Sequence, residues 1–129
     1  MKLLLDTHIW LWLIQEASRL PRSYDAALTN SANLLFLSVA SVWEVGIKQQ
    51  LGKLSLGTSF EEFLLESLAG VQLVDITLSH VKKVNQLPLH HRDPFDRIIV
   101  AQAMIEGLTL MSVDPMMAPY EATILPSRA

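Results

Sequence analysis

Short apolar segments that alternate with longer amphipathic ones constrain the fold of this chain more than any other feature. The mostly apolar segments are Lys2–Leu5, Leu34–Leu37, Leu73–Ile76 and Leu108–Ser112, with Ala122–Leu125 as a candidate fifth. Strands this short and apolar, separated by helices, are typical of a parallel sheet that is covered on both faces. We therefore expect an α/β fold with a central parallel sheet of four to five strands.

Capping signals place helices between these strands. The expected helices are His8–Gln15 after Asp6-Thr7, a short one opened by Pro21, Ser38 to about Leu51, one begun by Ser59 with Glu62 as its capping box, Thr77–Gln86, and Asp93-Pro94 to about Glu106. Gly52 and Gly107 follow two of them, at the position where glycine commonly ends a helix.

Length and composition limit the classes of protein to consider. A chain of 129 residues, half of them apolar, predicts a single domain over residues 1–129 with a full core. The absence of cysteine excludes disulfides and thiolate metal sites, and fits a cytoplasmic protein. The net charge of −3 argues against a protein that coats nucleic acid by bulk electrostatics. No apolar run reaches the ~20 residues that a membrane span needs, so we expect no membrane association.

Acidic side chains stand at the ends of the predicted strands. Asp6 follows the first strand directly, and Asp114 comes two residues after the fourth. Asp96 lies in the first turn of the helix before the fourth strand, and Glu44 lies within an otherwise apolar helix. Active sites of parallel sheets form beyond the carboxyl ends of the strands. Carboxylates that converge there can hold hard divalent cations, which catalyse phosphodiester hydrolysis.

Each acid also has a purely structural interpretation. Asp6, Asp93 and Asp114 could be helix or turn caps. Glu44 could pair with Lys48 one helical turn later, and Asp96 could favour the positive end of its helix. From local pattern alone these alternatives stay open.

Four segments resemble PIN-domain proteins, in the family's order. They are Leu4-Leu5-Asp6-Thr7-His8, Ser38–Val45 continuing to Leu51-Gly52-Lys53-Leu54, His91–Ala103, and Leu110-Met111-Ser112-Val113-Asp114. The second segment continues as in the VapC-type toxins. The matches span residues 3 to 114, which is most of the chain.

The resemblance implies a three-layer α/β/α fold and a metal-dependent endoribonuclease, the toxin of a type II toxin–antitoxin system. It implies Mg²⁺ or Mn²⁺ as cofactor, RNA as substrate, a cognate antitoxin as partner, and a homodimer. The residues that match the family's acids are Asp6, Glu44, Asp96 and Asp114, which the resemblance makes both catalytic and metal-binding.

Further residues near these motifs have open roles. The resemblance favours Asp96 over Asp93 as the ligand, and gives Ser112 a supporting hydrogen bond. Arg97 could hold a phosphate together with Arg92, or could pair with the neighbouring aspartates.

The histidines and tryptophans favour structural roles. His90 and His91 are predicted on a solvated loop, with RNA contact as the alternative, and His80 is predicted on the surface. The spacing of Trp10, Trp12 and Trp43 predicts core packing, with an antitoxin groove or a dimer seam as the alternative.

Two other functions compete with a nuclease. A phospho-acceptor receiver domain would need an acidic pair after the first strand and a lysine after the last, and neither is present. A catalytically inactive PIN-like binding module for RNA or protein is the second alternative, although all four matching acids are in place.

Overall fold

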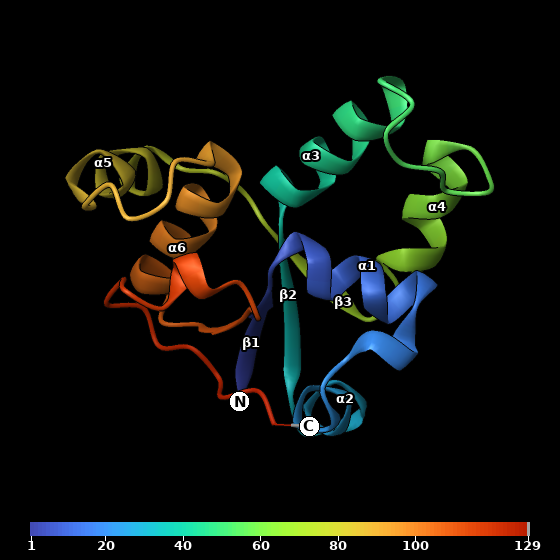
Figure 1. Cartoon of the computed structure of the whole chain (residues 1–129), viewed down its shortest axis with the longest axis horizontal. Coiled ribbons are helices and arrows are strands. Elements are labelled where there is room, and N and C mark those ends of the chain that lie inside the picture. The colour runs from blue at the N-terminus through green and yellow to red at the C-terminus, as the bar shows by residue number, and fades with distance from the viewer. Residues whose placement is uncertain (129) are drawn as a thin grey trace.

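The computed structural model of the chain describes residues 1–128 and contains a four-stranded parallel sheet with helices on both faces (Figure 1). The elements in chain order are β1 (Lys2–Leu5), α1 (Thr7–Gln15), the 3-10 turn η1 (Ala17–Arg19), α2 (Arg22–Thr29), β2 (Leu34–Ser38), α3 (Val39–Gln50), α4 (Phe60–Ser67), β3 (Val71–Val74), α5 (Leu78–Gln86), α6 (Pro94–Glu106), β4 (Thr109–Met111) and the 3-10 turn η2 (Pro115–Met117). The predicted α/β fold is therefore confirmed.

The strand order of the sheet is β3-β2-β1-β4. The chain moves outward from β1 through β2 to β3, then returns across the sheet to place β4 on the other side of β1. The order thus reverses between β1 and β4, and the carboxyl ends of these two strands flank the position where parallel sheets bind ligands. The candidate fifth strand forms only an isolated bridge between Leu110 and Ile124.

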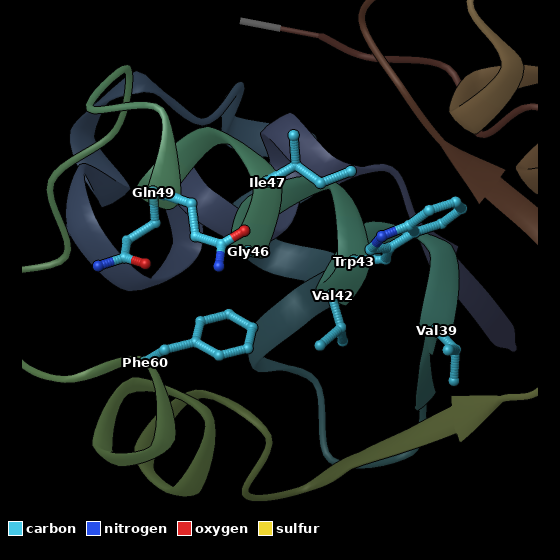
Figure 2. A pocket seen from close by; sticks show the side chains of 8 residues that line it. Val39, Val42, Trp43, Gly46, Ile47, Gln49 and Phe60 are labelled. Atoms are coloured by element: carbon cyan, nitrogen blue, oxygen red, sulfur yellow. The ribbon is translucent and has the colours of Figure 1, made fainter.

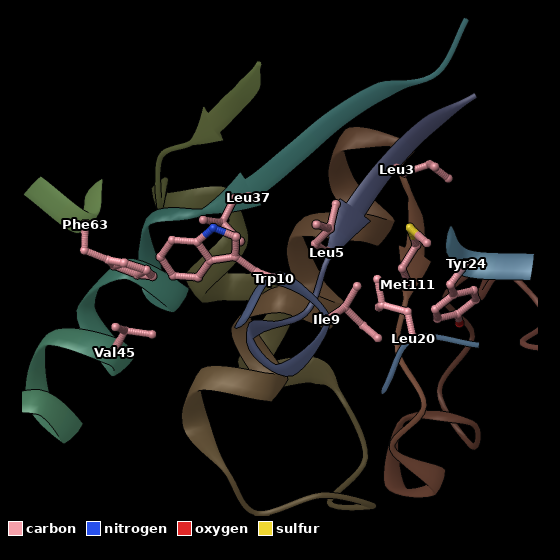
Figure 3. Packing of buried hydrophobic residues seen from close by; sticks show 10 residues of the cluster. All are labelled: Leu3, Leu5, Ile9, Trp10, Leu20, Tyr24, Leu37, Val45, Phe63 and Met111. Atoms are coloured by element: carbon pink, nitrogen blue, oxygen red, sulfur yellow. The ribbon is translucent and has the colours of Figure 1, made fainter. Parts of the chain in front are cut away.

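The side chains of β1 alternate between two apolar layers. Leu3 and Leu5 pack into a cluster with residues of α1, α2, α3 and α4, including Trp10 and Phe63 (Figure 3). Leu4 points to the opposite face and packs against α6 and the chain that follows it. Because all three leucines are fully buried, the central strand is held on both faces.

The third strand begins earlier than predicted. We expected Leu73–Ile76, whereas β3 covers Val71–Val74 and pairs with β2 from Leu35 onward. Gly70 adopts φ 75° and lets the chain leave the end of α4 and enter the strand at once. Asp75 and Ile76 therefore lie beyond the strand.

The start of α4 differs from its predicted capping, and α5 begins with a capping box that was not predicted. Ser59 accepts from the Glu62 backbone N–H, but the Glu62 carboxylate accepts from Thr58 Oγ1, so the expected capping box is incomplete. The complete capping box is at α5, where Thr77 and His80 bond each other's backbone N–H groups. His80 is fully buried and lies 2.8 Å from Glu106, so its predicted surface position is wrong.

The tryptophans divide between core and surface. Trp10 is fully buried and Trp12 is partly buried, but Trp43 is 61% exposed, so its predicted place in the core is wrong. Trp43 lies on the exposed side of α3, and the ring of Phe95 packs edge-on against it. Among the described residues, no helix combines the length and hydropathy that a membrane crossing requires.

Candidate active site

Three aspartates meet where the strand order reverses. Asp6 follows β1 directly, Asp114 follows β4, and Asp96 lies in the first turn of α6. The Asp6 backbone N–H donates to the Met111 carbonyl at 3.1 Å, which fixes the ends of β1 and β4 side by side. The fold therefore brings together side chains that are up to 108 residues apart in the sequence.

Asp6 is almost completely buried, at 3% exposure. Its Oδ1 accepts from the Ile9 backbone N–H at 2.9 Å and caps α1. Burial raises the pKa of Asp6, and hydrogen bonds from the Ser112 hydroxyl and the Ile9 amide oppose that rise. Ser112 thus stands beside the first acid, as the family resemblance implied.

Asp96 and Asp114 are joined by an imidazole. His91 Nε2 lies 2.9 Å from Asp96 Oδ2 and 3.1 Å from Asp114 Oδ2. One side-chain ligand atom of each of these three residues lies within 4.8 Å of the others. His91 is therefore part of the acidic cluster, and its predicted place on a solvated loop is wrong.

The cluster makes a negative charge on Asp96 unfavourable. Burial, followed by the charges of Asp93 and Glu44, raises the pKa of Asp96 to about 7. Its side chain is only 16% exposed, so little water compensates for these neighbours. A divalent cation would remove this repulsion.

Glu44 lies at the edge of the cluster and is held from two sides. Its Oε1 accepts from Thr7 Oγ1 at 2.7 Å, and its Oε2 lies 3.0 Å from Lys48 Nζ. The structural interpretation, a pair with Lys48, is thus realised. The charge of Glu44 also raises the pKa of Asp96, so Glu44 acts on the cluster without being released from Lys48.

Asp93 is the N-cap of α6. Its Oδ1 accepts from the backbone N–H groups of Phe95 at 2.9 Å and Asp96 at 3.4 Å. Pro94 occupies the first helical turn, as expected for an aspartate-proline start. The capping interpretation of Asp93 is confirmed, and its charge adds to the field of the cluster.

Arg97 points away from the aspartates. It is 8% exposed, and its guanidinium donates to backbone carbonyls that include Pro88 and Val84, each at 2.9 Å. It also donates to Tyr120 Oη at 3.1 Å. Neither expected role, phosphate binding or pairing with Asp93 and Asp96, fits this geometry. Arg97 instead fastens the segment between α5 and α6, while Arg92 is exposed.

The donor set suits a hard divalent cation. Asp6 and Asp114 each use Oδ1 to cap a helical turn, and Asp114 Oδ2 faces the cluster. Hard carboxylate oxygens without any thiolate match the preference of Mg²⁺ and Mn²⁺. Burial, together with the charges of Asp93 and Glu44, raises the pKa of Asp96, and a bound cation would offset both effects.

Sequence reasoning missed two residues of the site. Thr7 is buried and donates to Glu44, and the only signal was its place beside Asp6 in the first motif. His91 opens the third motif, but its sequence neighbours are exposed or polar and suggested a loop in water.

An apolar hollow of about 430 Å³ lies between α3 and α4 (Figure 2). Val42, Trp43, Gly46 and Phe60 are among its lining residues. Trp43 both lines this hollow and packs against Phe95 of α6, the residue that precedes Asp96 in the sequence.

Comparisons with known proteins agree with this architecture. The family model described as PIN domain matches residues 3–121. No curated protein matches the chain. Similar solved structures are VapBC2 from Rickettsia felis bound to a promoter DNA fragment (TM-score 0.74, 19% identity, 98% of each chain covered) and a toxin–antitoxin complex from Klebsiella pneumoniae (0.68, 19%, 98% of each). VapBC-1 from nontypeable Haemophilus influenzae is similar over 92% of this chain and 91% of that chain, with a TM-score of 0.64 and 16% identity. At these identities the structures show the shared fold.

Proposed function

The chain belongs to the PIN-domain family, and from this premise we propose that it is a divalent-metal-dependent endoribonuclease and the toxin of a toxin–antitoxin pair. Family membership removes the receiver-domain alternative. The observation that carries the proposal is the meeting of Asp6, Asp96 and Asp114 at the reversal of strand order. An inactive binding module would have no need to bury two of these carboxylates, Asp6 and Asp96, at the cost of a raised pKa for each.

We assign Mg²⁺ or Mn²⁺ to Asp6, Asp96 and Asp114, with Glu44 at the edge of the site. When bound, such a cation lowers the pKa of a coordinated water and offsets the charge of the phosphodiester. Ser112 and the Ile9 amide orient Asp6, and Thr7 orients Glu44.

Lys48 supplies positive charge beside this acidic site. Its side chain is 38% exposed while it contacts Glu44 at 3.0 Å. An exposed ammonium at this position can meet a phosphate of the RNA backbone and draw it toward the carboxylates. The protein's net charge is −3, so local cations of this kind have to attract the substrate.

The direct test is cleavage of a fluorescent RNA panel by purified protein. We expect cleavage with Mg²⁺ or Mn²⁺, none with EDTA, and none by Asp96→Asn under any of these conditions. Asp25→Asn, which changes an exposed acid on α2, is the matched control and should cut as wild type does. Cleavage that survives chelation, or that Asp96→Asn retains, would refute the metal mechanism. RNA binding without cleavage would instead support the inactive module.

We further propose that a segment of the cognate antitoxin occupies the hollow between α3 and α4. Similar structures come from toxin–antitoxin assemblies, and the hollow presents apolar side chains, among them an exposed tryptophan that packs against Phe95, the neighbour of Asp96 in sequence. An amphipathic segment bound there would cover the path to Asp96. A homodimer remains part of the proposal, and its test is the mass measured by light scattering.

Trp43→Arg tests the antitoxin site. The product of the neighbouring reading frame, if it is the antitoxin, should inhibit wild-type cleavage and lose at least tenfold in affinity for the variant. Leu65→Arg changes an exposed leucine of α4 that is not among the residues lining this hollow, and serves as the control. Equal loss of affinity in both variants would place the antitoxin elsewhere.

A further inference from the structure

His91 contacts the carboxylates of two proposed metal ligands at once. Its Nε2 lies 2.9 Å from Asp96 Oδ2 and 3.1 Å from Asp114 Oδ2, and its side chain is only 15% exposed. By residue type and position, His91 could be a third ligand beside Asp96 and Asp114. The hydrogen bond at its other ring nitrogen, Nδ1, decides whether Nε2 can bind a metal.

The backbone determines which nitrogen of His91 carries the proton. The Asp93 backbone N–H donates to His91 Nδ1 at 3.2 Å. A backbone amide always keeps its hydrogen, so Nδ1 must be the acceptor and Nε2 must carry the proton of the neutral ring. Histidines that bind metals show the reverse arrangement, in which the nitrogen away from the metal donates its N–H. His91 therefore presents an N–H donor to the two carboxylates.

Buried groups hold this imidazole in place. The His91 backbone N–H donates to Tyr120 Oη at 2.8 Å, and Arg97 Nη1 donates to the same oxygen at 3.1 Å. Tyr120 is 5% exposed and Arg97 is 8% exposed. Arg97 also donates to the Pro88 carbonyl, so both ends of the 88–91 segment are tied to α6. These buried hydrogen bonds therefore hold the His91 imidazole against the carboxylates of Asp96 and Asp114.

We propose that His91 is a positioning residue that holds Asp96 and Asp114 through its Nε2–H and competes with the divalent cation for them. A cation held by both carboxylates would compete for the oxygens to which this N–H donates. The imidazole thereby sets the cation concentration at which the site fills. This inference rests on the proposed metal site.

The two roles of His91 predict opposite effects on metal affinity. Removing a competitor should tighten metal binding, whereas removing a ligand should weaken it. Mn²⁺ binding is therefore measured by titration calorimetry without RNA, and melting is measured in EDTA. The proteins are wild type, His91→Ala, His91→Met, which keeps bulk without a donor, and His91→Gln, which keeps an amide donor. His90→Ala is the control, since His90 is the exposed neighbour whose ring packs on Tyr120.

The proposal expects about tenfold tighter Mn²⁺ binding by His91→Ala and His91→Met, the loss of one hydrogen bond to charged groups. It also expects both to melt lower than wild type in EDTA. His91→Gln should stay within about threefold of wild type in affinity, and His90→Ala should not change it. Weaker Mn²⁺ binding by the Ala and Met variants would make His91 a ligand, and an unchanged affinity would show that its contact does not affect metal binding. Either result overturns this inference and leaves the proposed metal site in place. Should either the Ala or the Met variant fail to fold, the other still shows whether Mn²⁺ binding tightens or weakens. A wild-type protein that binds no Mn²⁺ would overturn the metal site and this inference together.

Discussion

Asp96→Asn is expected to stabilise the metal-free protein although it abolishes cleavage. Burial, Asp93 and Glu44 raise the pKa of Asp96 from 3.8 to about 7. A raised folded-state pKa means that ionisation destabilises the fold: this penalty is absent below pH 3.8, grows as pH rises, and is complete above pH 7. Asparagine carries no charge and escapes the penalty at every pH.

The expected gain in stability follows from the pKa shift of Asp96. A rise from 3.8 to about 7 corresponds to about 4 kcal/mol at about 1.36 kcal/mol per pH unit. The side chain is 16% exposed, and solvent screens part of this interaction, so we expect about 2 kcal/mol at pH 8. For a chain of 129 residues that is a rise in Tm of about 6 °C.

Thermal melting in EDTA at pH 5 and pH 8 measures the effect. The advantage of Asp96→Asn at pH 5 should be less than half of its value at pH 8, because wild-type Asp96 is mostly protonated at the lower pH. Mn²⁺ should stabilise wild type more than the variant. Asp25→Asn, an exposed acid outside the cluster, should melt as wild type at both pH values. A variant that melts below wild type at pH 8 and gains as much from Mn²⁺ would refute the reasoning.

Substitutions at three other residues in and around the site separate structural roles from catalytic ones. Asp93→Asn keeps a capping oxygen and should retain most activity and stability, whereas Asp93→Ala should lose about 1 kcal/mol in urea unfolding; equal losses would deny the cap. Arg97→Met should leave buried carbonyls unpaired, lower stability by at least about 3 kcal/mol, and speed amide hydrogen exchange between residues 84 and 91; exchange that stays slow would show that Arg97 does not fasten this segment. Thr7→Val removes the donor to Glu44 at constant shape, and should cost about 1 kcal/mol and reduce the cleavage rate more than RNA affinity; a change confined to affinity would contradict this.

The sequence predicted those parts of the molecule that depend on local pattern. The apolar alternation yields the sheet, and aspartates placed directly after strands must meet if the strands are parallel neighbours. Asp93 was predicted as a cap because an aspartate before a proline carries that signal within two residues. These features can be predicted without knowing which distant residues they contact.

The remaining features depend on contacts between distant segments. Arg97 looked like a phosphate ligand, because nothing near it in sequence reveals that the 84–91 carbonyls fold over its guanidinium. His91 reaches Asp114 only because Tyr120, far along the chain, receives its backbone N–H. Trp43 has core-like spacing on α3, but the groove beside it is left open.

Asp6 and Asp114 each serve two purposes with one side chain, since one oxygen caps a helical turn. Mutational drift is therefore constrained in an unusual way. An alanine at either position removes a cap as well as a charge, and costs about 1 kcal/mol of stability. Asparagine preserves the cap oxygen while it removes the anionic charge. A lineage that abandoned nuclease activity would thus reach a stable descendant through asparagine first, and asparagine at these two positions in a relative would mark a protein that has kept the fold after losing the reaction.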